Sequence, residues 1–167
     1  MATDDPGGSP RDDAHAMWRA FAATTGAPMQ EEPVVVRFGD SAALADELVG
    51  LVLEGTKRAT AGLVADFRHD GEPLPRIGGH WIACDGAGVP RAVLRSTELR
   101  LGTLASVDDA FAWEEGEGDR TRTTWLATHR RYFARTLAAR GQAWDDDLEV
   151  VFERFRVVWP PEVADPA

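Results

Sequence analysis

The stretch FGDSAALADELVGLVLEGTKRAT, residues 38–60, specifies one helix and the segment that follows it. Its apolar residues recur at i, i+4, i+7 and i+8, the spacing of one helix face, at Leu44, Leu48, Leu51 and Val52. Asp40 or Ser41 provides a side-chain cap at the start, and Gly55 is the expected stop. The pattern therefore predicts a core-facing helix that ends at Gly55, followed by an extended segment over residues 61–64.

The end of this predicted helix carries a lysine and a hydroxyl three residues apart, Lys57 and Thr60. Basic and hydroxyl groups at such a point lie where the chain turns back toward the core, and they could take part in binding or catalysis there. Alternatively, Lys57 and Arg58 complement the partial negative charge of the helix C-terminus, and Thr60 is an ordinary strand residue. Residues 54–60 alone leave both interpretations open.

The remaining segments combine predicted strands with a few helices. Strands are indicated by a β-branched run, by two segments around a glycine turn and by a final alternating segment, at residues 34–38, 80–85, 90–101 and 149–159. A short helix is predicted from Asp13 to Thr25, and a long surface loop over residues 65–79. Without repeated strand–helix alternation, four or five strands and three or four helices favour an α+β domain with a small, partly closed β-barrel.

An acidic turn, Glu-Gly-Glu-Gly-Asp-Arg at residues 115–120, separates two further predicted helices. The first would begin at Ser106, and the second would be capped by Asp119 or Thr121. Glycines on both sides of Glu117 break the helix and let the backbone bring that carboxylate close to another group. A solvated acidic turn is the alternative.

The length of 167 residues predicts one domain with its own core. We expect a single domain over residues 16–160, a flexible acidic leader over residues 1–15 and a frayed tail over residues 161–167.

The one cysteine, Cys84, lies in an apolar run, which predicts a buried side chain and a cytoplasmic protein without an internal disulfide. No apolar run reaches the length of a membrane span, so we expect no membrane partner. The sequence makes no prediction of the oligomeric state.

The charge distribution bears on the class of ligand. The net charge of −10 argues against a protein that coats nucleic acid without sequence preference, because neutralising the phosphates needs Lys and Arg. Residues 119–140, however, hold six arginines against one aspartate, a balance of +5. These arginines scatter around their predicted helix, but a locally basic face on an acidic protein is compatible with the pattern. His69 and His80 lie at the two ends of the predicted loop, and two separate histidines do not predict a metal site.

The order of these motifs resembles the ASCH domain family of the PUA-like superfamily. The similarity extends over roughly residues 16–160, and it is best in residues 38–60, in the EGEGDR turn and in VVFERFRVVWP at residues 150–160. The resemblance implies a PUA-like β-barrel and a link to RNA. Some members are similar to ribonucleases that act on single strands, and a shorter branch removes acetyl groups from acetylated cytidine.

The resemblance also implies a set of site residues. In the amidohydrolase branch, the site is a lysine and a threonine three apart together with a glutamate; Lys57 and Thr60 match the pair, and Glu117 best matches the glutamate, with Glu115 as the other register. Lys57 would act as a base if burial lowered its pKa, or it would stabilise negative charge while protonated. Glu117 would move protons. No residue is predicted as a metal ligand.

Three functions follow from the resemblance. The first is binding and cleavage of single-stranded RNA, with Arg58, Arg120 and Thr121 as phosphate contacts. The resemblance fixes no cofactor, although a nuclease activity could use a divalent metal. The second is an amidohydrolase that deacetylates a 4-acetylcytidine-type nucleoside. The third is a non-catalytic module that binds RNA or nucleotides. The chain length and the EGEGDR turn favour the ribonuclease branch, whereas the acidic net charge favours a small neutral substrate.

Overall fold

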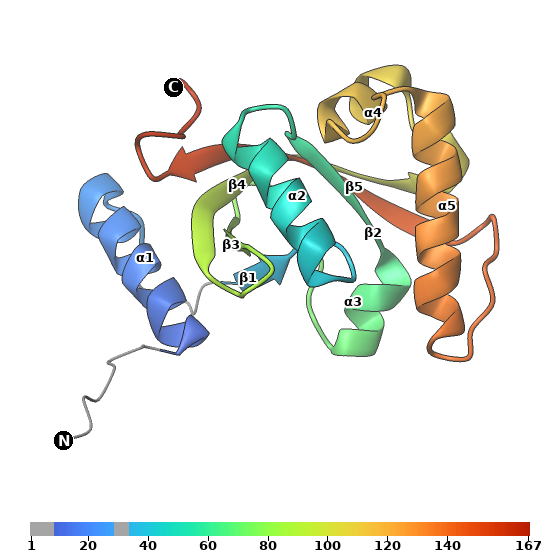
Figure 1. The fold of residues 1–167 in the computed structure, drawn as a ribbon, viewed down its shortest axis with the longest axis horizontal. Coiled ribbons are helices and arrows are strands. Elements are labelled where there is room, and N and C mark those ends of the chain that lie inside the picture. Colours follow the sequence, from blue (N-terminus) through green and yellow to red (C-terminus); the bar gives the residue numbers. More distant parts are fainter. Residues whose placement is uncertain (1–8, 29–33) are drawn as a thin grey trace. The chain divides into compact units, whose positions relative to one another are not determined.

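The computed structural model describes residues 9–28 and 34–167. Within these residues the chain forms five α-helices, a short 3-10 helix and five strands (Figure 1). The predicted α+β class is confirmed. Residues 1–8 of the predicted leader lie outside the described part, whereas residues 10–15 belong to the first helix.

The contacts group the chain into two compact units. The first unit takes the described residues up to Leu53, with His80–Leu94 and Val157–Ala167; the second takes Glu54–Gly79 and Arg95–Arg156. The first unit holds α1 (Pro10–Thr25), β1 (Val34–Arg37), α2 (Ala42–Leu53) and β3 (His80–Cys84). The second unit holds β2 (Ala59–Leu63), α3 (Val64–Asp70), η1 (Leu104–Ser106), α4 (Asp109–Glu115) and α5 (Arg122–Ala138). Two long strands, β4 (Pro90–Thr103) and β5 (Glu149–Trp159), contribute residues to both units.

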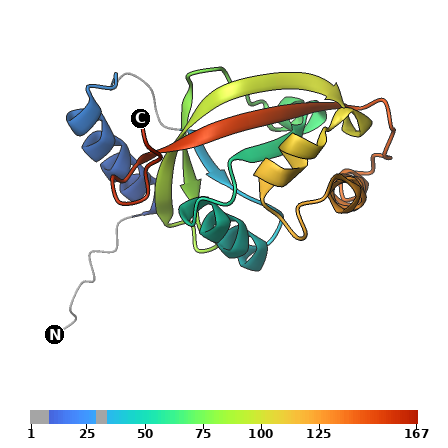
Figure 2. The same ribbon diagram turned by 90° about the horizontal axis from the view of Figure 1, so that it is seen from above.

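The strands form one mixed sheet in the order β1-β3-β4-β5-β2. β1 runs parallel to β3, with Val34 opposite Trp81. β2 runs antiparallel to β5, with Ala59 opposite Arg154 and Thr60 opposite Glu153. The long strands β4 and β5 lie next to each other, as Figure 2 shows. The predicted final strand and the predicted hairpin of residues 80–101 are therefore present.

The core of the first unit is aromatic. Trp18 and Phe21 of α1 pack with the buried Ile82, Cys84 and Val93. Cys84 is 2% exposed, and burial raises the pKa of its thiol to about 11, which agrees with a structural side chain. α1 begins at Pro10, earlier than the predicted Asp13, because Ser9 and Asp12 form a capping box.

α2 confirms the helix predicted from residues 38–60. The Ser41 hydroxyl accepts the Leu44 N–H at 3.2 Å. The predicted Leu48 and Val52 are buried, together with Ala45 and Val49, whereas the predicted Leu44 and Leu51 are half-buried. The helix leads directly into the segment that carries Lys57.

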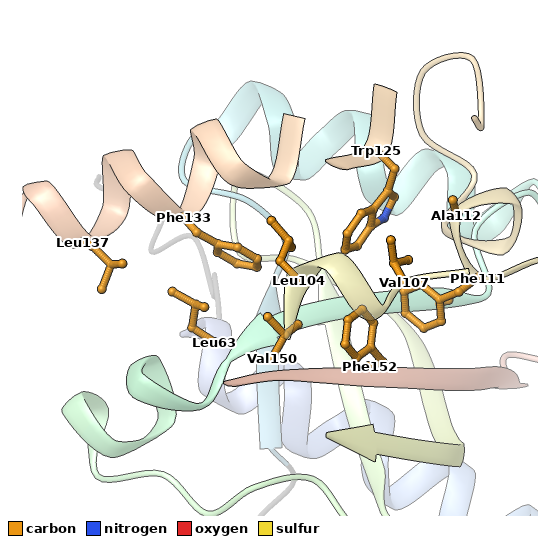
Figure 3. Close-up of a cluster of buried hydrophobic side chains, with 11 residues drawn as sticks. Leu63, Leu104, Val107, Phe111, Ala112, Trp125, Phe133, Leu137, Val150 and Phe152 are labelled. Carbon is orange, nitrogen blue, oxygen red and sulfur yellow. The ribbon is translucent and has the colours of Figure 1, made fainter. Parts of the chain in front are cut away.

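The core of the second unit joins its helices to β2 and β5. Figure 3 shows the buried side chains, among which the rings of Phe111 and Phe152 meet edge to face at 5.1 Å between centroids. Trp125, Phe133 and Leu137 enter the same cluster from α5. This cluster fixes both ends of the turn that connects α4 to α5.

Two local predictions are wrong. Residues 65–79 do not form one long loop, because α3 occupies the first part; the Phe67 ring packs over Gly62 and Gly71 ends the helix in a left-handed conformation. Ser106 does not cap α4: Asp108 accepts the Phe111 N–H at 2.7 Å, and the Ser106 hydroxyl donates to the Thr103 carbonyl. Within residues 161–167, the Asp165 N–H donates to the Val157 carbonyl at 2.9 Å.

Candidate functional site

The segment that carries Lys57 is fixed from two sides. The Arg58 N–H donates to the Glu114 carbonyl at 2.7 Å, and the Arg58 carbonyl accepts the Phe155 N–H at 3.0 Å. Glu114 in turn receives the Arg154 guanidinium from β5. The end of α4 and the middle of β5 therefore hold the backbone on either side of Lys57 in place.

Gly116 permits the close approach of the acidic turn to this segment. It ends α4 at φ 75°, and its N–H donates to the Trp113 carbonyl. A Cβ at this position would lie 2.6 Å from the Thr56 carbonyl oxygen, which no ordinary side chain tolerates. The sequence predicted that the glycines would bring the turn against another group, and that group is the segment of Lys57.

The Lys57 ammonium lies between two carboxylates. Its Nζ is 2.9 Å from Glu115 Oε2 and 2.7 Å from Glu117 Oε1. The side chains of Lys57 and Glu115 are each 1% exposed, whereas that of Glu117 is 25% exposed. Both registers of the predicted glutamate therefore meet Lys57, but Glu117 is the carboxylate that solvent reaches.

A fourth ionisable group, His129, completes the cluster. Its Nε2 lies 3.5 Å from Glu115 Oε1 and its Nδ1 lies 3.0 Å from the Trp125 carbonyl oxygen. The carbonyl oxygen requires the proton on Nδ1, and the buried carboxylate near Nε2 favours a second proton there, so these contacts favour the imidazolium. The ring stacks on Trp125 at 3.8 Å between centroids. Sequence reasoning missed His129, although Trp125, His129, Phe133 and Leu137 repeat every four residues along one helix face.

The pKa directions agree with this arrangement. Burial alone would lower the pKa of Lys57, but the two carboxylates outweigh it and raise the pKa above its ordinary value. Burial likewise opposes ionisation of Glu115, yet Lys57 and His129 hold its pKa well below the usual range. Glu115 raises the pKa of His129 despite burial. Two cations thus balance two carboxylates in a buried cluster.

Glu117 differs from the other three groups. Burial raises its pKa above the ordinary value, and the nearby Glu115 adds to the rise, while Lys57 opposes it. Glu117 combines a raised pKa with access to solvent, so it is the group in the cluster best suited to exchange a proton with a substrate. Lys57, with its raised pKa, is suited to stabilising negative charge and not to acting as a base.

Glu115, Glu117 and His129 also have ligand atoms within 4.8 Å of one another, the kind of grouping that can hold a metal ion. Lys57 Nζ, however, already contacts both carboxylates and supplies the positive charge that they require. A protonated His129 offers no lone pair to a metal. In this arrangement the Lys57 ammonium, and not a divalent cation, neutralises the two carboxylates.

The structure places Thr60 differently from Lys57. Its neighbours Ala59 and Leu63 enter the cluster of Figure 3, so alternation along β2 directs Thr60 to the opposite face of the sheet. There it lies opposite Glu153, a buried carboxylate that accepts a hydrogen bond from the Ser96 hydroxyl. The described contacts of Lys57 Nζ run to Glu115 and Glu117 instead of to Thr60.

The predicted phosphate contacts lie in the two segments that meet at the site. Arg58 Nη1 donates to the Lys57 carbonyl at 2.7 Å. The Arg120 guanidinium lies over the Trp113 ring. Thr121 caps α5: its hydroxyl accepts the Thr124 N–H at 3.2 Å and donates to Asp119 at 2.8 Å. This cap is a structural contact that holds the turn next to Glu117.

Comparison with known proteins identifies the family. The family model of the ASCH domain matches residues 34–159. A crystal structure of a protein from Enterococcus faecalis is similar at 30% identity and a TM-score of 0.80, covering 88% of each chain. A crystal structure of an ASCH domain from Lactobacillus crispatus is 24% identical, with a TM-score of 0.80, over 89% of this chain and 96% of that one. No curated protein matches.

These comparisons confirm the predicted PUA-like fold. ASCH domains are generally RNA-binding. Among the residues that the structure describes, none of the helices combines the length and apolar character needed to cross a bilayer. The match over residues 34–159 includes the Lys57 segment, the acidic turn and α5. The protein is therefore a member of the ASCH domain family.

Proposed function

We propose that the protein binds single-stranded RNA in the cytoplasm and cleaves it, with Glu117 as the group that transfers protons. One observation carries this proposal: a buried ammonium, Lys57 Nζ, is held 2.7 Å from a carboxylate that remains 25% exposed. A substrate can therefore reach Glu117 while Lys57, Glu115 and His129 stay behind it. RNA supplies its own nucleophile, the 2′-hydroxyl, so this reaction does not require activation of Thr60.

The chemistry balances with the groups present. The Glu117 carboxylate takes the proton of the 2′-hydroxyl, the 2′ oxygen attacks phosphorus, and the bond from phosphorus to the 5′ oxygen breaks. The departing oxygen takes the proton back from the Glu117 carboxyl group. The products are a 2′,3′-cyclic phosphate and a 5′-hydroxyl. Lys57 lowers the pKa of Glu117 through its charge and adds positive potential where the phosphate becomes more negative.

Positive charge near the site supports a phosphate-bearing substrate. Residues 119–140 begin two positions after Glu117 and carry a balance of +5, six arginines against one aspartate, although Arg130 pairs with Asp146 and Arg140 with Asp66. Arg58 adjoins Lys57, and Arg120 belongs to the turn that contains Glu117. Binding that depends on such charges weakens as salt concentration rises.

A specific observation also favours the amidohydrolase alternative. Thr60 lies opposite the buried Glu153, which could accept the proton of its hydroxyl in place of Lys57. The raised pKa of Lys57 weighs against the version in which Lys57 is the base. We therefore rank deacetylation of a 4-acetylcytidine-type nucleoside second, and a non-catalytic RNA- or nucleotide-binding module third.

The test uses one end-labelled single-stranded RNA and three proteins: the wild type, Glu117→Gln and the control Glu98→Gln. Glu98 is also a carboxylate of the second unit, but it lies on β4 and is 54% exposed. We expect Glu117→Gln to lose roughly 100-fold or more in cleavage rate while it still binds RNA, and Glu98→Gln to cleave normally.

The products identify the reaction. A 2′,3′-cyclic phosphate end supports the proposed route, whereas wild-type protein that binds RNA and leaves it intact would support the binding module. Acetylated cytidine is incubated separately with the same proteins. Release of cytidine by the wild type, without RNA cleavage, would move the protein to the amidohydrolase function.

A further inference from the structure

Trp113 is exposed beside the candidate site. It is 57% exposed, whereas Trp18, Trp81 and Trp125 are buried. A single exposed apolar side chain is common on protein surfaces and has no meaning alone. Trp113, however, is the third residue before Gly116, and its carbonyl accepts the Gly116 N–H at 3.2 Å, so its position is tied to the turn that carries Glu117.

Arg120 covers one face of this indole. Its guanidinium carbon lies 3.8 Å from the centroid of the Trp113 ring, and its Nε donates to the Trp113 carbonyl at 2.8 Å. The planar guanidinium holds the ring in one orientation, and the exposed area of the indole remains open to a second flat group.

The backbone of Arg120 adopts a left-handed conformation. Among the described residues, Arg120 is the non-glycine residue with a positive φ, 61°. Its N–H donates to the Glu117 carbonyl at 3.0 Å, which closes the turn. Strained conformations of this kind persist where the surroundings enforce them, and they concentrate at functional sites. The indole, the guanidinium and Glu117 therefore belong to one hydrogen-bonded turn, residues 113–120.

We propose that Trp113, supported by Arg120, is a stacking platform for one unpaired base of the RNA. This inference rests on the proposed function and adds the residue that positions the strand at Glu117. An unpaired base offers a flat aromatic face, and stacking on tryptophan accepts any base. The arginines that follow in residues 119–140 favour a ligand whose flat group is joined to phosphates.

The test measures the affinity of a 2′-O-methyl RNA 12-mer at fixed salt, because this RNA cannot be cleaved by the proposed route. The proteins are the wild type, Trp113→Ala, Trp113→Phe and the control Leu101→Ala, which removes another exposed apolar side chain of the second unit, 51% exposed. We expect Trp113→Ala to weaken binding roughly 5- to 100-fold, Trp113→Phe to retain most of the affinity and Leu101→Ala to match the wild type.

A second series places one abasic site at each position of the RNA in turn. For the wild type, loss of one particular base should weaken binding about as much as Trp113→Ala does, and Trp113→Ala should show no further loss with that RNA. If the two losses add at every position, or if Trp113→Ala binds as tightly as the wild type, the platform is wrong while RNA binding stands. A wild type that does not bind RNA contradicts both the platform and the proposed function. Circular dichroism of each variant checks that the fold is retained.

Discussion

Replacing Lys57 by methionine tests whether the buried cluster is held together by charge. The substitution keeps an unbranched side chain, shorter by one atom, and removes the ammonium that contacts Glu115 and Glu117. Removing one partner of a buried ion pair costs about 3–5 kcal/mol, because the remaining charge stays buried without compensation. We expect a loss of this size for Lys57→Met, a large share of a total stability that is about 5–15 kcal/mol for ordinary domains.

The matched control is Arg130→Met. Arg130 pairs with Asp146 at 2.8 Å, but the two side chains are 53% and 66% exposed. Such a surface pair contributes about 0.2–1 kcal/mol. Both variants replace a cation by methionine, so the difference between them isolates the effect of burial.

The assay is urea unfolding at neutral pH, followed by far-ultraviolet circular dichroism. A second variant, Lys57→Met with Glu115→Gln, removes both charges of the buried pair. Its loss should be smaller than the sum of the two single losses by about 0.5–3 kcal/mol, since the partners interact directly. The reasoning is refuted if Lys57→Met costs no more than Arg130→Met, or if the two single losses simply add.

Four further predictions concern protons, glycines and metal. The folded-state pKa of Glu115 is lowered, so its contribution to stability is present above the ordinary value of 4.5 and is lost as pH falls below it. Glu115→Gln should therefore flatten the acid side of the curve of stability against pH, measured by urea unfolding at several pH values. The pH dependence due to His129 has the opposite sign, because its folded-state pKa is raised: its contribution to stability is present below the ordinary value of 6.5 and is lost as pH rises through the folded-state pKa. His129→Gln should therefore flatten the neutral-to-alkaline side of the stability curve. An unchanged slope of stability against pH would argue against the imidazolium. Gly118→Ala should reduce the free energy of unfolding by about 1–2 kcal/mol, because the backbone is left-handed there but the added Cβ would have space. Gly116→Ala should reduce it more and abolish RNA cleavage, because its Cβ would meet the Thr56 carbonyl. Equal effects of the two variants in thermal unfolding and in cleavage assays would contradict the close approach of the turn to Thr56. Addition of EDTA should leave RNA cleavage unchanged, because Lys57 supplies the positive charge of the cluster, and a loss of cleavage restored by Mg²⁺ would show that this assignment is wrong.

The sequence predicts the fold best where local signals agree. α2 shows apolar residues at helical spacing and a cap at Ser41, and β5 alternates over residues 149–159, so both were predicted with nearly correct bounds. α3 was missed because seven residues rich in charge carry no strong period, and its packing depends on the fit of Phe67 over Gly62. Short helices of this kind are set by tertiary contacts that a local pattern does not contain.

Some residues of the candidate site could likewise be predicted from the sequence, and others could not. Lys57 and Glu117 were predicted through the family resemblance, and the structure brings them together. The local pattern could not separate Glu115 from Glu117, because that choice depends on which carboxylate is buried. His129 needed knowledge of the buried face of α5, where its ring stacks on Trp125. Thr60 was grouped with Lys57 by spacing, yet the alternation of β2 directs it to Glu153.

The pairing of β2 with β5 also determines when this protein can fold during its synthesis. Ala59 and Leu63 pair with Arg154 and Val150, so β2 must wait until the much later segment of β5 has left the ribosome. Until Glu115 and Glu117 emerge, the Lys57 ammonium has no carboxylates and must remain in water. We therefore expect nascent chains that stop before residue 149 to remain open to protease in the second unit, even though all of its helices have already been translated.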